Sequence, residues 1–332
     1  MSHDDDFDAV APRRDGQTAP SRDSDEAVAP GRGLTGTPEP ASHLDDASIR
    51  RSFDRASGAY EKSAVLQARV GDELLQRLDF FNLSPDVVVD LGAGTGRITG
   101  ELKRRYKRAQ VIALDIAPGM LREARKHMSF FRRFERVCAD VRRLPFTDAS
   151  VDIAASNLML QWCEDLDAAF REVRRVLKPD GLFAFTTFGP DTLRELREAW
   201  AAVDGYSHVN TFIDMHDIGD ALVRAGLTEP VLDVERVTLT YPDVLALMRD
   251  LKVIGAHNVT AGRPRGLLGR GTLRRLEAAY ESARRSGRIP ATYEVVYGAA
   301  WGSAGKRAER AVDGEVRIPL GSIRKRREGG RP

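Results

Sequence analysis

The sequence of 332 residues predicts an α/β fold, in which a mainly parallel sheet carries helices on both faces. Two observations predict it. Short apolar runs recur between residues 87 and 189, and amphipathic segments with helical periodicity lie between them. A strand followed by a helix and a further strand forms a βαβ unit, whose two strands run parallel in one sheet. The hydrophobic fraction of 42% is enough for one large domain or two modest ones.

The two ends of the chain differ from its body. Residues 1–46 hold 4 Arg and 11 Asp and Glu, a net charge of 4 − 11 = −7, and residues 303–332 hold 9 Lys and Arg and 4 Asp and Glu, or 9 − 4 = +5. The body, residues 47–302, therefore carries +2 + 7 − 5 = +4. Because the leader has too few apolar side chains to offset its ordering entropy, we expect it to be disordered, and we expect a largely flexible tail.

The elements follow in order from the hydrophobic periodicity. Two helices with a bend near Glu61–Ser63 are expected first. Strands are expected at 87–92, 110–116, 135–140, 181–189, 231–241 and 292–302, with one more at the start of 150–162. Helices are expected at 97–106, 118–128, 165–178, 190–202, 215–227, 243–256 and 271–285, the helix at 243–256 with Leu245, Met248, Leu251 and Val253 or Ile254 facing inward.

The compartment is suggested by the cysteines and by the apolar runs. Cys138 and Cys163 lie far apart and form no CxxC pair, which favours a reducing compartment over a disulfide framework. No run resembles a signal peptide or reaches membrane-spanning length. We therefore expect a cytoplasmic monomer without membrane contact.

The stretch DLGAGTGRI, residues 90–98, lies where a strand gives way to a helix. Gly92, Gly94 and Gly96 allow a tight turn and a close approach of a ligand to the backbone. The pattern is GxGxG and not the dinucleotide GxGxxG, because Arg97 occupies the position of the last glycine. Alone, such a turn is weak evidence for a site.

Acidic residues at the ends of the next two strands strengthen the evidence for a binding site at this turn. Asp115 lies at the end of the second strand, where a carboxylate can accept both ribose hydroxyls. Asp140 lies at the end of the third strand and suits an exocyclic adenine amine. Since parallel strands end at the same edge of the sheet, the three acidic strand ends predict a nucleoside pocket there.

Five motifs together resemble class I S-adenosylmethionine-dependent methyltransferases over residues 87–190: VVDLGAGTG, LDIAPGML, ADVRRLPF, ASNLMLQW and LKPDGLFAFTTFG. The resemblance implies a Rossmann-like sheet of seven strands with an antiparallel last strand, and S-adenosyl-L-methionine as methyl donor. It implies that Asp90 and Gly92 flank the methionine moiety, Asp115 holds the ribose, Asp140 and Val141 hold the adenine, and Asn157 lies near the methyl group. The other implied cofactor residues are Ala93, where many members have Cys, and Gly94, Gly96, Ile116 and Met120.

A narrower resemblance covers most of residues 47–302. RRSFDRASGAYEKSAVLQ, TFGPDTLRELREAW, HVNTFIDMHDIGDALVRAGL, LTYPDVLALMRDLKVIGAHN and PATYEVVYGAAW look like the malonyl-[acyl-carrier protein] O-methyltransferases of biotin synthesis. The family implication is methyl-ester formation on the free carboxylate of a malonyl group bound to acyl carrier protein. It also implies a single domain over residues 47–302 with a helical cap inserted at about 243–288.

Methylation of a carboxylate needs no strong base, because the acceptor is already ionised at neutral pH. The protein must orient it, for which a Tyr hydroxyl or an arginine fork is suited. Tyr60, on the helical entry segment, and Arg263, in the cap, are therefore our catalytic candidates. Lys252, His257, Asn258 and Arg265 are candidates for substrate binding. The alternatives without a functional role are a buried aromatic anchor for Tyr60 and a solvated basic loop for the cap residues.

Other functions remain open on the sequence. The chain could methylate a quinone or another carboxylic acid, or act as a methyltransferase-fold assembly factor on a protein subunit. His208, His216 and Asp217 could suggest an iron site, but their spacing is irregular and we propose no metal ligands. The basic tail lacks interleaved aromatic residues, so we expect no nucleic-acid partner.

Overall fold

A computed structural model describes residues 46–58, 60–204, 206, 208–253, 269–302, 309–310 and 316–317. All of these belong to one compact unit, Ala41–Pro332. The predicted leader (except its last residue) and most of the tail lie outside the described residues. So do four cap candidates, His257, Asn258, Arg263 and Arg265.

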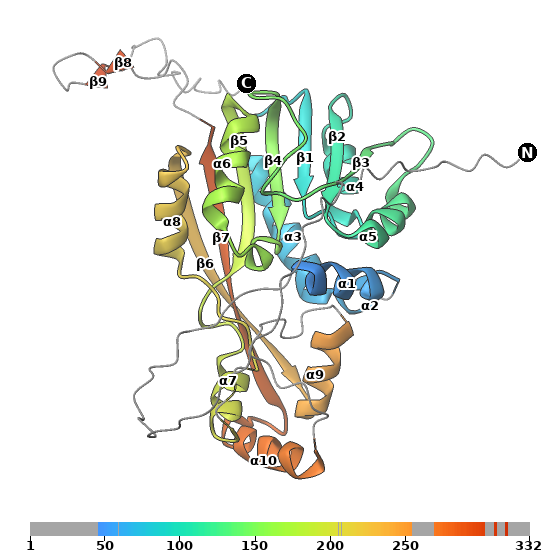
Figure 1. Ribbon diagram of the computed structural model, residues 1–332, viewed down its shortest axis with the longest axis vertical. Coiled ribbons are helices and arrows are strands. Elements are labelled where there is room, and N and C mark those ends of the chain that lie inside the picture. The colour runs from blue at the N-terminus through green and yellow to red at the C-terminus, as the bar shows by residue number, and fades with distance from the viewer. Residues whose placement is uncertain are drawn as a thin grey trace, which may run out of the picture. The chain divides into compact units, whose positions relative to one another are not determined.

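The main sheet has seven strands in the order β3-β2-β1-β4-β5-β7-β6 (Figure 1). Their bounds are β1 Val87–Leu91, β2 Gln110–Asp115, β3 Glu135–Cys138, β4 Val151–Asn157, β5 Leu177–Phe188, β6 Thr228–Tyr241 and β7 Ile289–Trp301. Strand β7 is antiparallel to both of its neighbours, and the pairings among β1 to β5 are parallel. The predicted sheet of seven strands with an antiparallel last strand is confirmed. A two-residue pair, β8 Glu309–Arg310 and β9 Val316–Arg317, lies outside this sheet.

Helices cover both faces of the sheet, as predicted. Their bounds are α1 Asp46–Ala56, α2 Tyr60–Ser63, α3 Val65–Arg77, α4 Arg97–Arg105, α5 Pro118–Glu123, α6 Leu166–Val176, α7 Arg194–Ala201, α8 Met215–Arg224, α9 Val244–Val253 and α10 Arg270–Tyr280. Short 3-10 turns span Leu78–Phe80, Ala124–His127, Leu160–Trp162 and Glu281–Ala283. On β1, Val88 packs into the core with α3 and α4, and its neighbour Val89 packs into the core with α6 and α8. This alternation is that of a strand buried on both faces.

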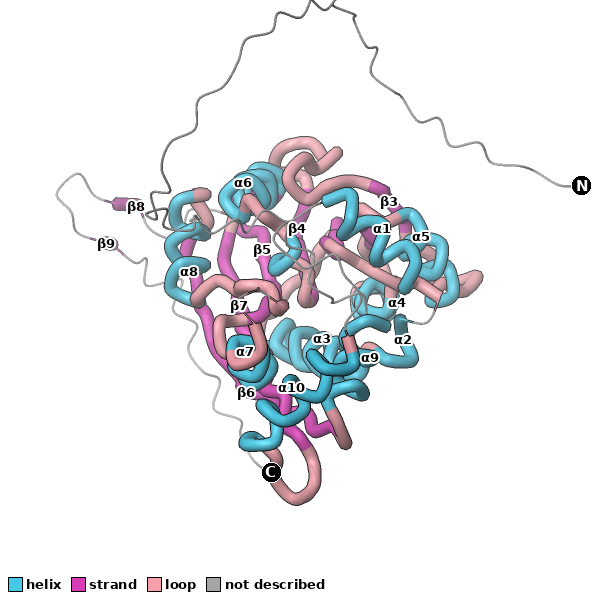
Figure 2. The backbone as a smooth tube through the Cα atoms, turned by 60° about the horizontal axis from the view of Figure 1, so that its bottom comes forward, coloured by secondary structure: helices cyan, strands magenta, loops and turns pink. Residues whose placement is uncertain are grey.

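Besides the two cores on the faces of the sheet, a third apolar core forms where the ends of β6 and β7 extend past the other strands (Figures 1 and 2). Strands β6 and β7 are 14 and 13 residues long, and their far halves pack with α7, α9 and α10. Leu66 and Val70 of α3 join the same core. Helices α7, α9 and α10 and the far halves of β6 and β7 thus form an apolar cluster, which α3 joins to the main sheet.

Several element boundaries differ from the sequence prediction, and the contacts explain those of β5 and α7. Helix α1 is described from Asp46, the last residue of the predicted leader, and the Asp46 side chain accepts a hydrogen bond from Arg142. Strand β5 begins at Leu177 and not after Gly181, since Leu177 already pairs with Val151. Helix α7 begins only at Arg194, because the preceding Gly189–Leu193 loop is bonded to β7. None of the described helices is both long and apolar enough to span a membrane.

Candidate active site

The glycine-rich turn joins β1 to α4 and is built on left-handed backbone. Gly92, Gly94 and Gly96 have φ angles of 71°, 54° and 81°. A Cβ at Gly92 would lie 2.2 Å from Met159 Cγ, and one at Gly96 would lie 2.7 Å from Ala124 Cβ. A Cβ at Gly94 would meet no atom within 4 Å. Gly92 and Gly96 are therefore required by packing, whereas Gly94 faces open space that a ligand can approach.

Asp115 ties this turn to the end of β2. Its Oδ2 accepts a hydrogen bond from the Gly94 amide, and its Oδ1 accepts one from the Ala117 amide, both at 2.8 Å. Burial raises the pKa of Asp115 to about 6, although these backbone hydrogen bonds act to lower it. Above that pH the carboxylate presents charged acceptor oxygens at the sheet edge.

Asp90, at the other side of the turn, is 1% exposed. The Thr99 hydroxyl donates to its Oδ2 at 2.6 Å. Burial raises the pKa of Asp90 to about 7, and the nearby charge of Asp115 adds to this, whereas the Thr99 hydrogen bond opposes it. Two carboxyl groups with raised pKa thus lie on either side of the glycine-rich turn, and perturbed pKa values of this kind cluster at functional sites.

This pair predicts how the stability of the ligand-free protein depends on pH. Each folded-state pKa lies above the unfolded value of 3.8, so the folded state binds more protons, and this stabilisation is present in full below pH 3.8 and is lost as pH rises from about 4 to about 7. Asp90 alone accounts for up to about 4 kcal/mol. We expect the melting temperature to fall between pH 5 and pH 8, and to fall less in Asp90→Asn. An equal fall in both proteins, measured by calorimetry, would contradict this assignment.

A cavity with an empty volume of about 790 Å³, including space open to solvent, lies beside the turn. It brings together most of the residues that the sequence predicted: Tyr60, Gly92, Gly94, Asp115, Ile116, Met120, Asp140, Val141 and Asn157. Asp90 and Ala93 line an adjoining hollow on the other side of the turn. Gly96 lines neither and packs on Ala124.

Asp140 lies at the far end of this cavity and is held by Arg142. The Arg142 Nε donates to Asp140 Oδ1 at 3.0 Å, and its guanidinium also bonds Asp140 Oδ2 and Asp46 Oδ2, each at 2.5 Å. Burial acts to raise the pKa of Asp140, but the hydrogen bonds and charge of Arg142 outweigh it and hold the pKa below its usual range. Asp140 is therefore ionised at neutral pH. The sequence reasoning missed Arg142 and Asp46.

Aromatic side chains form the roof of the cavity. Phe53 of α1 contacts Trp162 edge-on, with ring centroids 5.3 Å apart, and lies 6.5 Å from the ring of Tyr60. Burial, with the nearby Asp115 charge, raises the pKa of Tyr60 well above its usual value, so its hydroxyl stays protonated and can donate a hydrogen bond. Phe53 and Trp162 stood inside quoted motifs, but their periodicity alone indicated only core packing.

A second cavity of about 880 Å³ lies on the other side of Trp162, which lines both. Its walls come from β5, α7, the 208–212 segment, α9 and β7. The described lining residues are Gln67, Gln161, Trp162, Phe188, Thr192, Leu193, Leu196, Trp200, His208, Val209, Asn210, Phe212, Met248, Leu251 and Tyr293. Most are apolar, as in sites for small organic ligands. Of this set, Met248 and Leu251 were expected to face inward, and His208 figured in the sequence analysis only in the iron alternative.

Comparisons with known proteins agree with this geometry. Residues 89–185 match the methyltransferase domain family. The chain is 55% identical to a malonyl-[acyl-carrier protein] O-methyltransferase of Methylovorus sp. strain MP688, over 78% of this chain and 89% of that protein. It is 52% identical to a protein of the same name from Laribacter hongkongensis, over 82% and 95%. A crystal structure of a proposed methyltransferase from Bacillus halodurans superposes with a TM-score of 0.51 at 19% identity, covering 70% of this chain and 99% of that one.

The chain belongs to the malonyl-[acyl-carrier protein] O-methyltransferase family. Relatives at this identity span the cofactor half and the cap half together, so membership does not rest on the shared methyltransferase domain alone. Its fold is that of the class I S-adenosylmethionine-dependent methyltransferases.

In this family member, Lys252 lies on the exposed side of α9 and lines neither cavity. The prediction that Leu245 faces inward is wrong: it is 37% exposed, whereas Met248 and Leu251 point into the second cavity. Val253 is 36% exposed. The α9 face that packs inward is thus narrower than the amphipathic pattern indicated.

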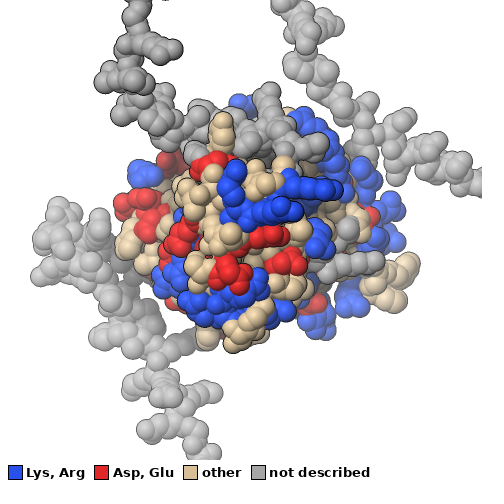
Figure 3. All heavy atoms as spheres, turned by 90° about the horizontal axis from the view of Figure 1, so that it is seen from below, with Lys and Arg blue, Asp and Glu red and all other residues tan. Residues whose placement is uncertain are grey.

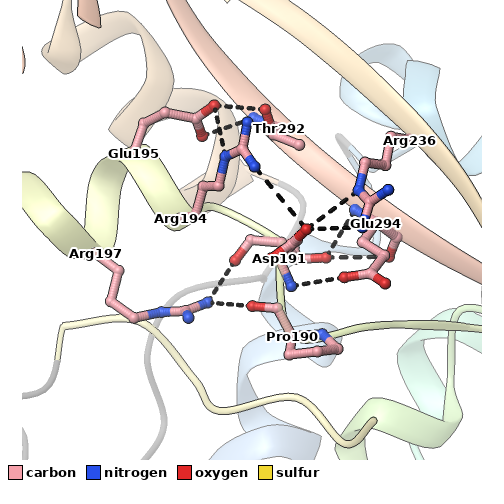
Figure 4. A network of polar contacts seen from close by, with 9 residues as sticks. Pro190, Asp191, Arg194, Glu195, Arg197, Arg236, Thr292 and Glu294 are labelled. Atoms are coloured by element: carbon pink, nitrogen blue, oxygen red, sulfur yellow. Dashed lines mark hydrogen bonds and ion pairs between the residues drawn. The ribbon is translucent and has the colours of Figure 1, made fainter. Parts of the chain in front are cut away.

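A polar network fixes the loop that leads into α7 (Figure 4). The buried Glu294 of β7 accepts a hydrogen bond from the Asp191 amide at 2.7 Å, and Arg236 of β6 bonds Asp191 at 3.1 Å. Glu195 accepts from the Thr292 amide at 3.0 Å. These contacts place Thr192 and Leu193 in the wall of the second cavity.

The two histidines of the iron alternative each contact an aspartate close in sequence. His208 bonds Asp204 at 2.9 Å and stacks on Trp200, and the exposed His216 bonds Asp214. In the part of the chain that the structure describes, no group of three or more His, Cys, Asp or Glu side chains is placed to hold a metal ion.

Proposed function

We propose that the protein transfers a methyl group from S-adenosyl-L-methionine to the free carboxylate of malonyl-[acyl-carrier protein], an early step of biotin synthesis. The observation that carries the proposal is the 55% identity to a protein of that name over nearly its whole length. It favours this reaction over the two alternatives, methylation of a quinone or another acid and an assembly role on a protein subunit.

The first cavity fits the methyl donor in its chemistry. The open space at Gly94 admits a ligand to the backbone, Asp115 suits two ribose hydroxyls, and the ionised Asp140 suits the adenine amine. Asp90, Gly92, Ala93, Ile116, Met120, Val141 and Asn157 complete the proposed set, with Gly96 in support. When bound, the donor supplies a methyl group on a positively charged sulfur.

The chain's own residues position the acceptor and need not remove a proton from it. A malonyl carboxylate is already ionised at neutral pH, and orientation of reacting groups can contribute about 7–11 kcal/mol in favourable cases. The protonated Tyr60 hydroxyl can orient one carboxylate oxygen. The aromatic roof of Phe53 and Trp162 excludes water from that place. Arg263 as orienting group, and Lys252, His257, Asn258 and Arg265 as substrate contacts, stay part of this proposal.

We also propose a domain organisation for the chain and an acidic carrier protein as its partner. We propose one domain over residues 47–302 with a cap at about 243–288, a disordered leader, and a basic flexible tail, in a cytoplasmic monomer. Arginines on α10, namely Arg270, Arg274 and Arg275, are exposed, and basic side chains gather on the face seen from below (Figure 3). Such a face favours an acidic carrier protein as partner.

The test is incubation with methyl-labelled S-adenosylmethionine and malonyl-[acyl-carrier protein], beside malonyl-coenzyme A and free malonate. We expect a base-labile methyl ester on the malonyl thioester. Binding of S-adenosylhomocysteine, measured by calorimetry, controls for an inactive preparation. Cofactor binding without any methylated malonyl thioester would refute the proposal.

A further inference from the structure

The second cavity carries polar groups that nothing in the described chain uses. Asn210 is 8% exposed, and its Oδ1 is buried without a hydrogen-bond partner. Gln67 Oε1, in the wall of the same cavity, is also buried without a partner. A buried polar atom left without a partner costs about 1–3 kcal/mol, so these two oxygens are acceptors that a donor entering the cavity would satisfy.

The charge of the lining restricts what the cavity can hold. None of the described lining side chains is Lys, Arg, Asp or Glu, and the one histidine, His208, is bonded to Asp204. A carboxylate or phosphate placed here would have no cation to pair with among these residues, which is costly in an apolar site. The cavity therefore suits a neutral ligand segment that is mostly apolar and carries a few hydrogen-bonding groups.

The position of the second cavity further restricts the kind of ligand that it can hold. Its border with the first cavity is the ring of Trp162, and Gln67 also lines the hollow beside Asp90. A chain lying in the second cavity thus has one end at the proposed methyl donor. If a malonyl group reacts there, the segment behind it is its thioester and whatever carries that thioester.

We propose that the second cavity binds the neutral amide-and-thioester arm of the acceptor, the pantetheine type of chain by which carriers hold acyl groups. This inference rests on the proposed function. The side-chain oxygens of Asn210 and Gln67 accept hydrogen bonds from amide N–H groups of the arm. Leu196, Trp200 and Phe212 pack on its methylenes. The malonyl carboxylate lies past Trp162, and the charged phosphate lies outside the cavity.

The variant that tests the proposal is Asn210→Leu, which keeps the side-chain size and removes the amide. Its readout is the Kd of malonyl-pantetheine for the complex with S-adenosylhomocysteine, measured by calorimetry, so that turnover is not needed. We expect a Kd about tenfold higher, the loss of one hydrogen bond to a buried group. The Kd of S-adenosylhomocysteine should change less than about twofold. The matched control is Asn82→Leu, at an exposed asparagine that lines neither cavity.

The melting temperature of Asn210→Leu distinguishes a ligand-binding role of Asn210 from a purely structural role. An amide that only holds the fold together would lower the melting temperature when it is replaced. We expect Asn210→Leu to melt at or above the wild-type temperature, because it removes an unsatisfied buried group.

A second ligand identifies the group that Asn210 binds. Malonyl ethyl thioester keeps the malonyl group and the thioester but has no amide, so the Asn210→Leu penalty should disappear with it. An equal penalty for both ligands, no penalty for either, or no binding of malonyl-pantetheine to the wild type would each overturn the proposal. Binding with the expected penalty but no methyl transfer would instead support the arm site and refute the proposed reaction.

Discussion

Replacement of Gly94 by valine is expected to weaken S-adenosylhomocysteine binding by roughly ten- to hundredfold, the usual effect of overpacking by about 1–3 kcal/mol. A Cβ at this position meets no protein atom within 4 Å, and Gly94 lines the first cavity. The added methyl groups therefore occupy ligand space without displacing protein. The φ of 54° also strains a branched side chain.

Gly287→Val is the matched control for that strain. Gly287 has a φ of 75°, and a Cβ there also meets no atom within 4 Å, but it lies in the turn before β7 and lines neither cavity. Both variants should lose about 1–2 kcal/mol of unfolding free energy in urea titrations. Only Gly94→Val should lose ligand affinity by calorimetry. If both variants bind S-adenosylhomocysteine like the wild type, Gly94 does not face the ligand.

The cofactor half of the fold could be predicted because its signals are local. The turn after β1 requires glycines within five residues, Asp115 is the last residue of β2, and Asp140 lies two residues after the end of β3. Parallel topology then brings separate strand ends to one edge without any knowledge of packing. That is why the predicted residues around this turn share one cavity.

The partners of those residues could not be predicted in the same way. Arg142 bonds Asp46 across 96 positions in the chain, and nothing in the sequence around either residue indicates that contact. Asn210 lies in an irregular segment, where no periodicity shows which side chains are buried. The hydrophobic pattern reports that a side chain avoids water, but not which distant surface covers it.

The cap shows the limit of periodicity in a helix. Leu245 fits the apolar stripe of α9, yet it is 37% exposed, because α9 packs through Val244, Leu247 and Leu251. A rotation of α9 by about 100°, the angle between adjacent residues of a helix, decides whether Val244 or Leu245 faces the core. That rotation is set by β6, β7 and α10, which are folded from other parts of the chain.

Asp115→Ala is expected to weaken S-adenosylhomocysteine binding by about a hundredfold or more, since charge-assisted hydrogen bonds contribute about 1.5–3 kcal/mol each. The carboxylate has two tasks: it accepts the Gly94 and Ala117 amides, and in our proposal it accepts two ribose hydroxyls. Asp115→Asn should not be neutral, because its NH₂ group replaces one of two oxygens that each face a backbone donor. We expect it to bind more weakly than the wild type.

Asp152→Ala separates the two tasks. Asp152 likewise accepts two backbone amides, from Asp86 at 3.0 Å and Val87 at 2.9 Å, but it lies at the opposite end of the strands and lines neither cavity. Both variants leave two amides without their acceptor and should lose about 1–3 kcal/mol of unfolding free energy. Only Asp115→Ala should lose affinity, measured by calorimetry at pH 8, where a carboxyl with a pKa of about 6 is ionised. If affinity falls equally in both variants, loss of fold rigidity explains the effect, and Asp115 does not hold the ribose.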